Sequence, residues 1–425
     1  MIELSASGTP SLAFRLKGAK QIKLSALSPC ALFACCVTIA ACSQATELSR
    51  LQYTPTVNVL SDRIDRRLSY HVLYNFSVLP DGNEPAAGLI DVDGTLYGTT
   101  AWGGGYGHGA AFSITSSGTE KVLHSFGKGT DGYYPQAGLI DVGGTLYGTT
   151  EYGGSGSCSN DFYHGCGTVF SITTGGKEKV LHSFSDAGAQ GSNPLAGLID
   201  VGGTLYGATK NGGSNNAGAI FSITTLGREK LLHSFGRGTD GRYPDATLID
   251  VGGRLYGTTF NGGGHGEGTV FSITTGGAEK VLHSVGKGSD GSEAGASLID
   301  VGGALYGTTF QGGYGGRGTV FRITTGGTEK VLHNFGLGTD GCYPLAALVD
   351  VGGTLYGTTY SGGMYGVGTA FSITTSGVEK VLHSFGNGSD GVFPVAGLIK
   401  VNETLYSTTY NGGLHNAGTV FALTP

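Results

Sequence analysis

The chain has 425 residues, of which 81 are glycine, while 39% are hydrophobic and 13% are charged. These glycines follow no Gly-X-Y period, which excludes collagen, and the hydrophobic share excludes a disordered chain. The formal net charge of −6 provides no basic footprint for nucleic acid. Helical folds are disfavoured because each glycine inside a helix costs about 1 kcal/mol relative to alanine. Composition therefore predicts an all-β protein, punctuated by glycine, that does not bind nucleic acid.

Residues 1–41 have the order of charged and apolar residues that is typical of an export signal. A basic stretch precedes a mostly apolar run over residues 24–41, which leads into the sequence Ile-Ala-Ala-Cys. This sequence resembles the lipobox of bacterial lipoproteins, and the resemblance implies cleavage before Cys42 and lipidation of that cysteine. We therefore predict a signal peptide over residues 1–41, a linker over residues 42–68, and an exported protein that is lipid-anchored in the bacterial cell envelope or on the cell surface. An ordinary signal peptide or an uncleaved anchor, with an incidental Cys42, is the alternative.

The rest of the chain is an internal repeat. The tripeptide Leu-Tyr-Gly, which becomes Leu-Tyr-Ser in the last copy, occurs seven times between Leu96 and Ser407. Successive copies are 50 residues apart, except for one spacing of 59 residues. Seven such units occupy residues 69–425, and we predict that they form one repeat domain.

Each unit has the pattern of four short strands, as the fifth copy illustrates. Residues 296–301 and 305–309 flank one glycine turn, and residues 319–324 and 329–335 flank a second one. A glycine-rich loop joins the second strand to the third. Because β-branched and aromatic residues bounded by glycine turns are typical of strands, repeated four-stranded units of this length indicate a β-propeller.

The two ends of the repeat array complete each other. The last unit lacks its fourth strand, whereas residues 71–76 match the fourth strand of the first unit at residues 121–126. We therefore predict an all-β, seven-bladed β-propeller with four antiparallel strands per blade, in which one N-terminal strand and three C-terminal strands form blade seven. The first strand of each unit begins with alanine and a small residue, such as Ala296-Ser297. Only small residues fit where blades converge, so we expect this strand to be innermost, with the aromatic residues further out.

The repeated pattern also carries a family resemblance. The sequence Leu-Ile-Asp-Val-Gly-Gly-Thr-Leu-Tyr-Gly-Thr-Thr, followed by Gly-Thr-Val-Phe-Ser-Ile-Thr-Thr and Glu-Lys-Val-Leu-His-Ser-Phe, resembles the bacterial GloVer tandem repeat. The resemblance covers all seven units, and the last one departs most, with Lys400 in place of aspartate and Ser407 in place of glycine. It implies a surface-associated propeller of the "choice-of-anchor" type, with Cys42 as the anchor, and it supplies no catalytic residues. Kelch propellers have similar blades, but their repeated tryptophan is missing here.

Recurrent histidines and aspartates do not predict a metal site. Six histidines occupy the same place in six outer strands, which lie too far apart to share one ion, so we expect them to form hydrogen bonds within or between blades. They are His124, His182, His233, His283, His333 and His383. The aspartates stand beside turns, where they accept bonds from amides, and no calcium-loop pattern occurs. We therefore expect no metal and no cofactor.

Cys158 and Cys166 bracket the insertion that lengthens the second unit. In an oxidising compartment they are candidates for a disulfide, whereas a zinc site is disfavoured because a second ligand pair is missing. Cys342 has no evident partner in the sequence.

The copies differ mainly in two sets of loops, which join the second strand to the third and one unit to the next. In an up-and-down blade both sets emerge at the same end of the ring, and such loops often carry function on a rigid scaffold. Their aromatic and polar residues suit the surface of a glycan or a protein. The candidate ligand-binding residues are Trp102, Tyr106, His108, Asn215, Arg242, His265, Glu267, Tyr314, Arg317, Tyr365 and His415. Unconstrained drift at the loop tips is the alternative.

These observations favour a monomeric binding module, held at the membrane by its lipid, that binds an extracellular glycan or protein through its variable loop face. A propeller-type carbohydrate-active enzyme, either a lyase or a hydrolase, is one alternative. Asp245 and Glu293 enter neighbouring inner strands, and glycosidases use two carboxylates about 5–10 Å apart. A purely structural protein of the cell envelope is the other alternative.

Overall fold

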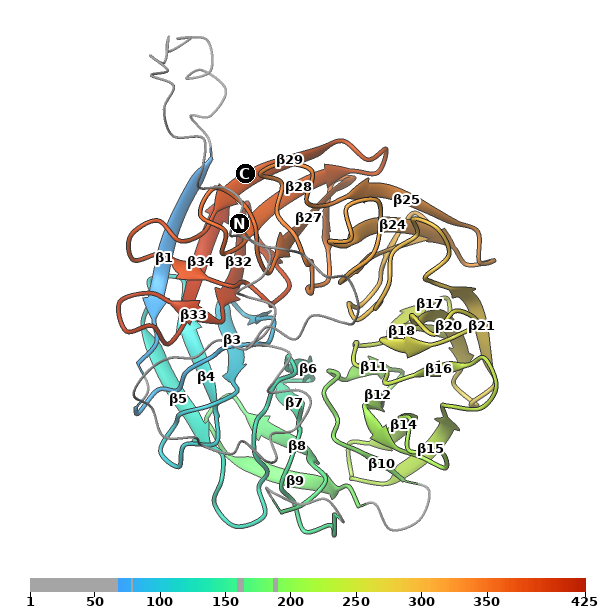
Figure 1. The fold of residues 1–425 in the computed structure, drawn as a ribbon. Coiled ribbons are helices and arrows are strands. Elements are labelled where there is room, and N and C mark those ends of the chain that lie inside the picture. Colours follow the sequence, from blue (N-terminus) through green and yellow to red (C-terminus); the bar gives the residue numbers. More distant parts are fainter. Residues whose placement is uncertain (1–67, 78, 159–163, 186–189) are drawn as a thin grey trace, which may run out of the picture. The chain divides into compact units, whose positions relative to one another are not determined.

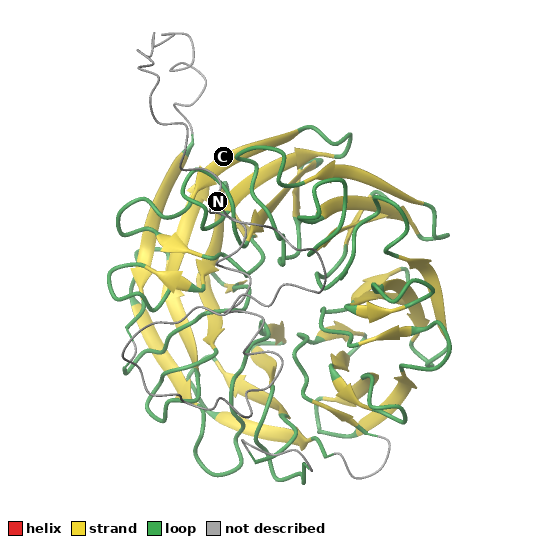
Figure 2. Ribbon diagram, in the orientation of Figure 1, coloured by secondary structure: helices red, strands yellow, loops and turns green. Residues whose placement is uncertain are grey.

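The computed structural model describes residues 68–77, 79–158, 164–185 and 190–425. The predicted signal peptide, Cys42 and the linker up to residue 67 lie outside these ranges. The described residues form strands, turns and loops and contain no helix (Figure 2). In these ranges there is accordingly no helix that is long and apolar enough to cross a membrane.

Seven four-stranded antiparallel sheets surround an axis as the blades of a β-propeller (Figure 1), which confirms the predicted fold. Blade 1 contains β2 (Ile90–Val92), β3 (Thr95–Thr100), β4 (Ala110–Thr115) and β5 (Glu120–Ser125), and blade 2 contains β6 (Ile140–Val142), β7 (Thr145–Thr150), β8 (Thr168–Thr173) and β9 (Glu178–Ser183). Blade 3 contains β11 (Ile199–Val201), β12 (Thr204–Thr209), β14 (Ala219–Thr224) and β15 (Glu229–Ser234), and blade 4 contains β17 (Ile249–Val251), β18 (Arg254–Thr259), β20 (Thr269–Thr274) and β21 (Glu279–Ser284). Blade 5 contains β22 (Ile299–Val301), β23 (Ala304–Thr309), β24 (Thr319–Thr324) and β25 (Glu329–Asn334), and blade 6 contains β26 (Val349–Val351), β27 (Thr354–Thr359), β28 (Thr369–Thr374) and β29 (Glu379–Ser384). Blade 7 contains β31 (Ile399–Val401), β32 (Thr404–Thr409), β34 (Thr419–Thr424) and β1 (Ser69–Asn75).

The ring is closed by the predicted combination of one N-terminal and three C-terminal strands. β1 pairs with β34 in antiparallel register, from Ser69 opposite Thr424 to Asn75 opposite Thr419. The first strands of neighbouring blades contact one another all the way round, including β2 with β31. Closure leaves no open sheet edge between the first blade and the last.

Phenylalanine rings fill the seams between blades. At six seams a ring that follows or ends the outer strand of one blade packs edge to face against a ring in the third strand of the next, as Phe335 does against Phe371 with centroids 5.1 Å apart. Val285 takes the corresponding position at the seventh seam and is equally buried. The glycine of Leu-Tyr-Gly makes room for this ring, since a Cβ at Gly307 would lie 2.7 Å from Phe321 Cζ. The aromatic residues are therefore in the outer part of each wedge, as expected.

The inner segments differ in length from the predicted strands. Residues 296–301 were expected to be one strand, but only Ile299–Val301 pairs with β23. The preceding carbonyl bonds to the neighbouring blade instead, because Thr258 Oγ1 donates to Ala296 O at 3.0 Å. Backbones also crowd at the axis, where a Cβ on Gly138 would lie 3.2 Å from Gly88 O. Both features confirm that this segment is innermost.

Removal of β1 should open the ring. A chain that starts at Ser77 loses Phe76, which is fully buried, and Tyr70, which stacks on His383 of blade 6 with centroids 3.8 Å apart. Losing Phe76 alone should cost about 3–5 kcal/mol. We expect this variant to aggregate or to melt far below a matched variant that starts at Leu68, as measured by calorimetry and light scattering. Equal melting temperatures of two monomeric variants would refute the closure.

Candidate functional site

The two sets of variable loops are bonded to each other at one end of the ring. In every blade the loop that enters the first strand pairs with the loop between the second and third strands. Three blades do so through short ladders, β10 (Gly191–Ser192) with β13 (Asn211–Gly212), β16 (Gly241–Arg242) with β19 (Asn261–Gly262), and β30 (Gly391–Val392) with β33 (Asn411–Gly412). The other four use isolated bridges, such as Ser292 with Gln311. We call the surface formed by these two loop sets the loop-end face.

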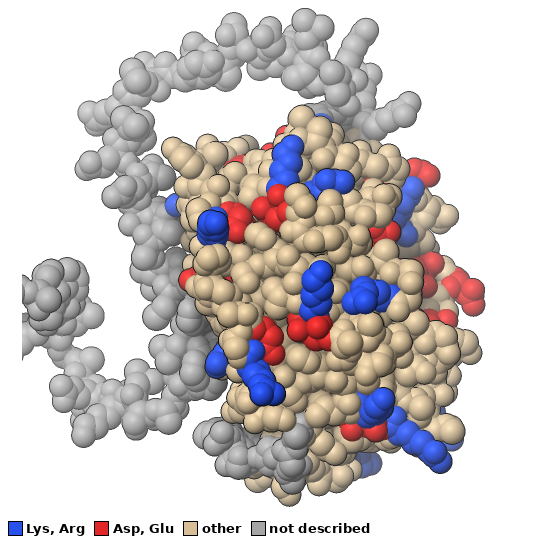
Figure 3. Space-filling view, turned by 90° about the vertical axis from the view of Figure 1, so that its right-hand side faces the viewer, with Lys and Arg blue, Asp and Glu red and all other residues tan. Residues whose placement is uncertain are grey.

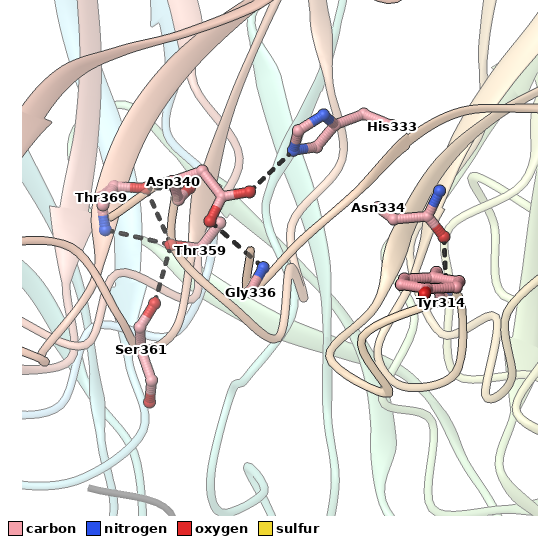
Figure 4. A network of polar contacts seen from close by, with 8 residues as sticks. All are labelled: Tyr314, His333, Asn334, Gly336, Asp340, Thr359, Ser361 and Thr369. Atoms are coloured by element: carbon pink, nitrogen blue, oxygen red, sulfur yellow. Dashed lines mark hydrogen bonds and ion pairs between the residues drawn. The ribbon is translucent and has the colours of Figure 1, made fainter. Parts of the chain in front are cut away.

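The tips of the loops after the second strands have fixed backbones. In blade 5 the amide of Tyr314 donates to Asn334 Oδ1 at the end of β25, at 2.8 Å (Figure 4). The equivalent bond occurs in all seven blades at 2.8–3.2 Å, with serine or asparagine as acceptor. The side chain of the tip residue plays no part in this bond, and that of Tyr314 is 83% exposed. The tips are therefore rigid positions at which the residue type can vary.

The loop entering each next blade is fastened by an aspartate. Asp340 Oδ2 lies 3.0 Å from His333 Nε2, and its Oδ1 accepts from the amide of Gly336 at 3.2 Å (Figure 4). Five blades contain this histidine pair at 2.9–3.3 Å, and in blade 7 the hydroxyl of Tyr74 donates to Asp81 at 2.6 Å. The loop after His182 includes the undescribed residues 186–189. The histidines thus hydrogen-bond to aspartates seven residues further on, and the described residues contain no group that could hold a metal ion.

A glutamate from the next blade faces five of these six aspartates, and Tyr70 takes that place beside Asp390. Burial, together with the charge of Asp340, raises the pKa of Glu379 to about 7. The pKa of the equivalent Glu120, Glu178, Glu279 and Glu329 is also raised to about 7, mainly by burial and further by the aspartate of the preceding blade, while His124 partly opposes the shift in Glu178. Each of these glutamates has an enclosed Oε1 without a hydrogen-bond partner. The seams therefore favour the protonated carboxyl up to about pH 7.

The channel mouth is defined by three residue sets at the loop end of the axis. A channel of about 350 Å³ passes between the inner segments. The first set comprises the lining residues that directly precede these segments, Ala86, Gln136, Leu195, Asp245, Gly295, Leu345 and Val395. The second set precedes the inner segments and has left-handed backbones, with φ between 57° and 62°, at Glu84, Tyr134, Asn193, Tyr243, Glu293, Tyr343 and Phe393. The third set follows the second strands and comprises Ala101, Glu151, Lys210, Phe260, Phe310, Tyr360 and Tyr410.

The left-handed residues connect the blades. The amide of Tyr343 donates to Arg317 O of the preceding blade at 2.8 Å, and its carbonyl accepts from the amide of Tyr360 at 3.0 Å. The same pair of bonds recurs at every blade. A bulky residue in this conformation costs of order 1–2 kcal/mol, and such strain is concentrated at functional sites.

One side of the channel mouth is charged. Lys210 Nζ lies 3.5 Å from Asp245 Oδ2 across the seam between blades 3 and 4, with both side chains about one fifth exposed at 23% and 19%. In blade 2 Gln136 Nε2 donates to Glu151 Oε2. Burial raises the pKa of both Asp245 and Glu151, while Lys210 acts in the opposite direction on both.

The other side of the channel mouth is aromatic. Tyr360 stacks on Phe393 with ring centroids 4.9 Å apart, and Phe310 lies 5.2 Å from Tyr343. Tyr410 donates its hydroxyl to Glu84. The mouth is therefore amphipathic: the cluster of Glu151, Lys210 and Asp245 lies over blades 2–4, and the aromatic faces lie over blades 4–7, where Glu293 and Glu84 accompany them.

The structure spreads the predicted ligand-binding residues over the loop-end face and does not gather them in one cluster. Exposed members are Trp102 at 38%, Tyr106 at 50%, Tyr314 at 83% and Tyr365 at 46%, together with Asn215, Arg242, His265, Glu267 and His415.

Some of the predicted residues also support their own loops. Asn215 Nδ2 donates to Phe235 O at 3.0 Å, and the half-buried His108 packs against Tyr133 with centroids 4.6 Å apart. The stem of the half-buried Arg317 lies over Gly336.

Other predicted groups have separate partners. Cys158 and Cys166 form a disulfide with their Cα atoms 5.5 Å apart. Asp245 pairs with Lys210, whereas Glu293 accepts from Gln311 Nε2 at 2.9 Å. Asp245 and Glu293, the two carboxylates considered for a glycosidase, therefore bind different partners and not each other.

Glu151, Lys210, Tyr360 and Tyr410 were absent from the sequence prediction. The signal that could have found them is the variation in residue type directly after the repeated Thr-Thr pair.

On the side of the molecule shown in Figure 3, lysine and arginine alternate with aspartate and glutamate, so no patch of one sign forms there.

The chain was compared with known proteins. It matches the model of the Gloeobacter/Verrucomicrobia repeat over residues 63–271 and 246–425. A search of curated proteins finds no match to the sequence.

Solved structures share the fold at low sequence identity. A virginiamycin B lyase from Staphylococcus aureus, solved as an inactive variant with quinupristin, is 14% identical at a TM-score of 0.56, covering 84% of this chain and 99% of that chain. The BP39L lectin from Burkholderia pseudomallei is 9% identical at a TM-score of 0.56, covering 84% of this chain and 96% of the lectin.

The seam glutamates predict a pH dependence of stability. Because the pKa of Glu379 is raised to about 7 from its ordinary 4.5, its stabilising contribution is complete below pH 4.5 and is lost as the pH rises through 7. Burial lowers the pKa of His182, His233 and His383, so these groups destabilise the fold only as the pH falls through their ordinary 6.5. Above pH 6.5, where these histidines contribute little, the free energy of unfolding should therefore fall until about pH 7.5 and then level off, and Glu379→Gln should reduce this fall. Glu403→Gln, whose side chain is 91% exposed, is the control. Identical slopes for Glu379→Gln and the wild type would contradict the assignment.

The loop residues and the blade residues should respond differently to substitution. Tyr314→Ala and Tyr106→Ala should change stability by less than about 0.5 kcal/mol, since both side chains are exposed. Tyr306→Ala should cost about 3–5 kcal/mol, because Tyr306 packs with Phe335 and Leu348 inside a seam. Denaturant unfolding measures both effects. A loss of stability in Tyr314→Ala as large as that in Tyr306→Ala would show that the face is part of the core.

Proposed function

This chain belongs to the Gloeobacter/Verrucomicrobia repeat family, and we propose that it is a binding module that holds an extracellular glycan or protein on its loop-end face. One fold can carry different functions, because function depends on the residues of a particular site, and the lectin and the lyase above share this fold with different functions. The proposal is therefore argued from the residues on the surface of this chain.

The supporting observation is the distribution of exposed apolar side chains. Ten large hydrophobic side chains are exposed in the described ranges, and eight of them lie on the loop-end face. All eight come from blades 5, 6, 7 and 1 or the loops that join them, and we call them the apolar arc: Leu79, Trp102, Tyr106, Tyr314, Leu337, Met364, Tyr365 and Leu414. Exposed apolar groups concentrated on one face mark interaction sites.

The rigidity of this face favours binding. Hydrogen bonds fix the loop tips before any ligand arrives, as for Tyr314 and Leu414. Fixed loops reduce the entropy that is lost on association. The left-handed residues around the channel mouth add stored strain at the same end of the ring.

A comparison of the two ends of the blades tests the binding function. Tyr314, Met364 and Leu414 are replaced together by serine, and the control replaces Leu226 and Val378, which are 82% and 69% exposed in turns at the other end. The probes are immobilised bacterial extracellular polysaccharides and purified envelope proteins, measured by biolayer interferometry. The wild type should bind at least one probe, and the triple variant should bind it at least about tenfold more weakly. Equal binding by the triple variant, or equal loss in the control, would contradict the proposal.

We also propose that the module is exported and anchored through a lipid on Cys42, as the N-terminal sequence suggests. Cys42→Ser should abolish labelling by a fatty-acid probe and release the protein from membranes, because acyl chains provide the anchoring free energy. Membrane retention of an unlabelled wild-type protein would refute this part.

A further inference from the structure

We infer that the channel mouth binds a primary alkylammonium group, the chemistry of a lysine side chain or of a small aliphatic amine. The inference rests on the proposed function in that the ligand arrives at the loop-end face. It uses different residues from the apolar arc, so the two can fail separately.

Acidic side chains outnumber basic side chains at the channel mouth. In the described residues of the three sets that define it there are four carboxyl groups, those of Glu84, Glu151, Asp245 and Glu293, and one ammonium group, that of Lys210. Glu84 and Glu293 accept hydrogen bonds from the neutral groups of Tyr410 and Gln311. Burial raises the pKa of Asp245, Glu151 and Glu293, and Lys210 opposes this shift in Asp245 and Glu151, so a further cation would stabilise the ionised form of these groups. A concave, low-dielectric mouth with an excess of acidic groups concentrates ligands of positive charge.

Asp245 is the acidic group that lines the channel itself. It is the one titratable side chain among the described residues that line the channel. Its Oδ1 is enclosed without a hydrogen-bond partner, and its Oδ2 is 3.5 Å from Lys210 Nζ. That separation exceeds the 2.7–2.9 Å typical of a charge-assisted hydrogen bond. A second ammonium group at Oδ2 would stabilise a carboxylate that is already largely withdrawn from water.

The walls of the channel distinguish an alkyl chain from a sugar. Most of the residues that line the channel below Asp245 are glycine, alanine, leucine and isoleucine, such as Gly138, Ala347 and Ile140. Two hydroxyls also line it, that of Ser297 and that of Thr247, which accepts from the amide of Gly197 at 2.9 Å. These walls suit methylene groups better than a saccharide, whose many hydroxyls would lose water there and gain few partners.

The aromatic side of the mouth adds a second source of attraction. Tyr360, Phe393 and Phe310 are half-buried around the same opening. An ammonium group over the face of an aromatic ring is attracted by about 0.5–2 kcal/mol, which an uncharged group does not gain. The acidic residues and the aromatic faces of the mouth therefore both favour a cation.

Calorimetric titration of the purified protein with 1,5-diaminopentane tests the inference, with 1,5-pentanediol as an uncharged control of similar length. The diamine should bind and the diol should not. Asp245→Asn and Glu151→Gln should each weaken diamine binding about tenfold or more, and Glu403→Gln should leave it unchanged. Lys210→Met should tighten binding severalfold by removing the competing ammonium group, a gain that loss of structure would not produce.

A second titration identifies the source of the amine. An acetylated peptide with one lysine is compared with the same peptide carrying acetyl-lysine. Binding of the lysine peptide alone assigns the site to a protein partner, binding of the diamine alone assigns it to a free amine, and both results support the site. If neither amine binds, if the diol binds as well as the diamine, or if Asp245→Asn and Glu151→Gln bind like the wild type, the inference is overturned. Polysaccharide or protein binding through the apolar arc would then still stand.

Discussion

The pairing of β1 with β34 is the interaction on which the rest of the structure depends. The strand comes from one end of the repeat domain and completes a blade made at the other end, some 340 residues away in the chain. The strand and the residue that follows it reach into both neighbouring blades, because Tyr70 stacks on His383 of blade 6 and Phe76 packs on Phe112 of blade 1. The seventh blade is thereby joined to both of its neighbours, and the circle of inner strands around the channel is complete.

A closed ring fixes the positions of groups that belong to different blades. The cluster of Glu151, Lys210 and Asp245 takes one residue from each of three blades, and the pair of Tyr360 and Phe393 takes one from each of two. No single repeat contains such a site. The bonds that hold the loops, such as that between His333 and Asp340, recur in most blades, whereas the side chains at the tips and the mouth differ. Repetition therefore stabilises the scaffold, and the differences between copies determine what each sector of the face can bind.

The fold was predictable from the sequence because its determinants recur with a period. Seven Leu-Tyr-Gly or Leu-Tyr-Ser copies, the glycine turns and the orphan strand at residues 71–76 led to the blade count and to the closure. The inner strands were predicted too long, because their alanine carbonyls bond to a threonine of the neighbouring blade, a contact between units that no single unit reveals. The exposed tips, such as Tyr314, were also predictable as variable positions. The channel mouth was not predictable, because the approach of Lys210 to Asp245 depends on how two blades pack together. The positive φ at Tyr343 and Phe393 was not predictable either, because these positions are not occupied by glycine, the usual sequence signal of such a backbone.

The most direct test of the closed ring is a disulfide engineered between β1 and β34. Ser69 lies opposite Thr424 in the ladder, so Ser69→Cys with Thr424→Cys should form a disulfide within one chain under mild oxidation. Mass spectrometry of the unreduced peptides detects the link, and Ser69→Cys with Thr224→Cys, the equivalent position in blade 3, is the matched control. The account predicts an intramolecular 69–424 link in a monomer that melts at or above the wild-type temperature. A natively melting monomer without that link, or equal linking to position 224, would contradict the closed ring.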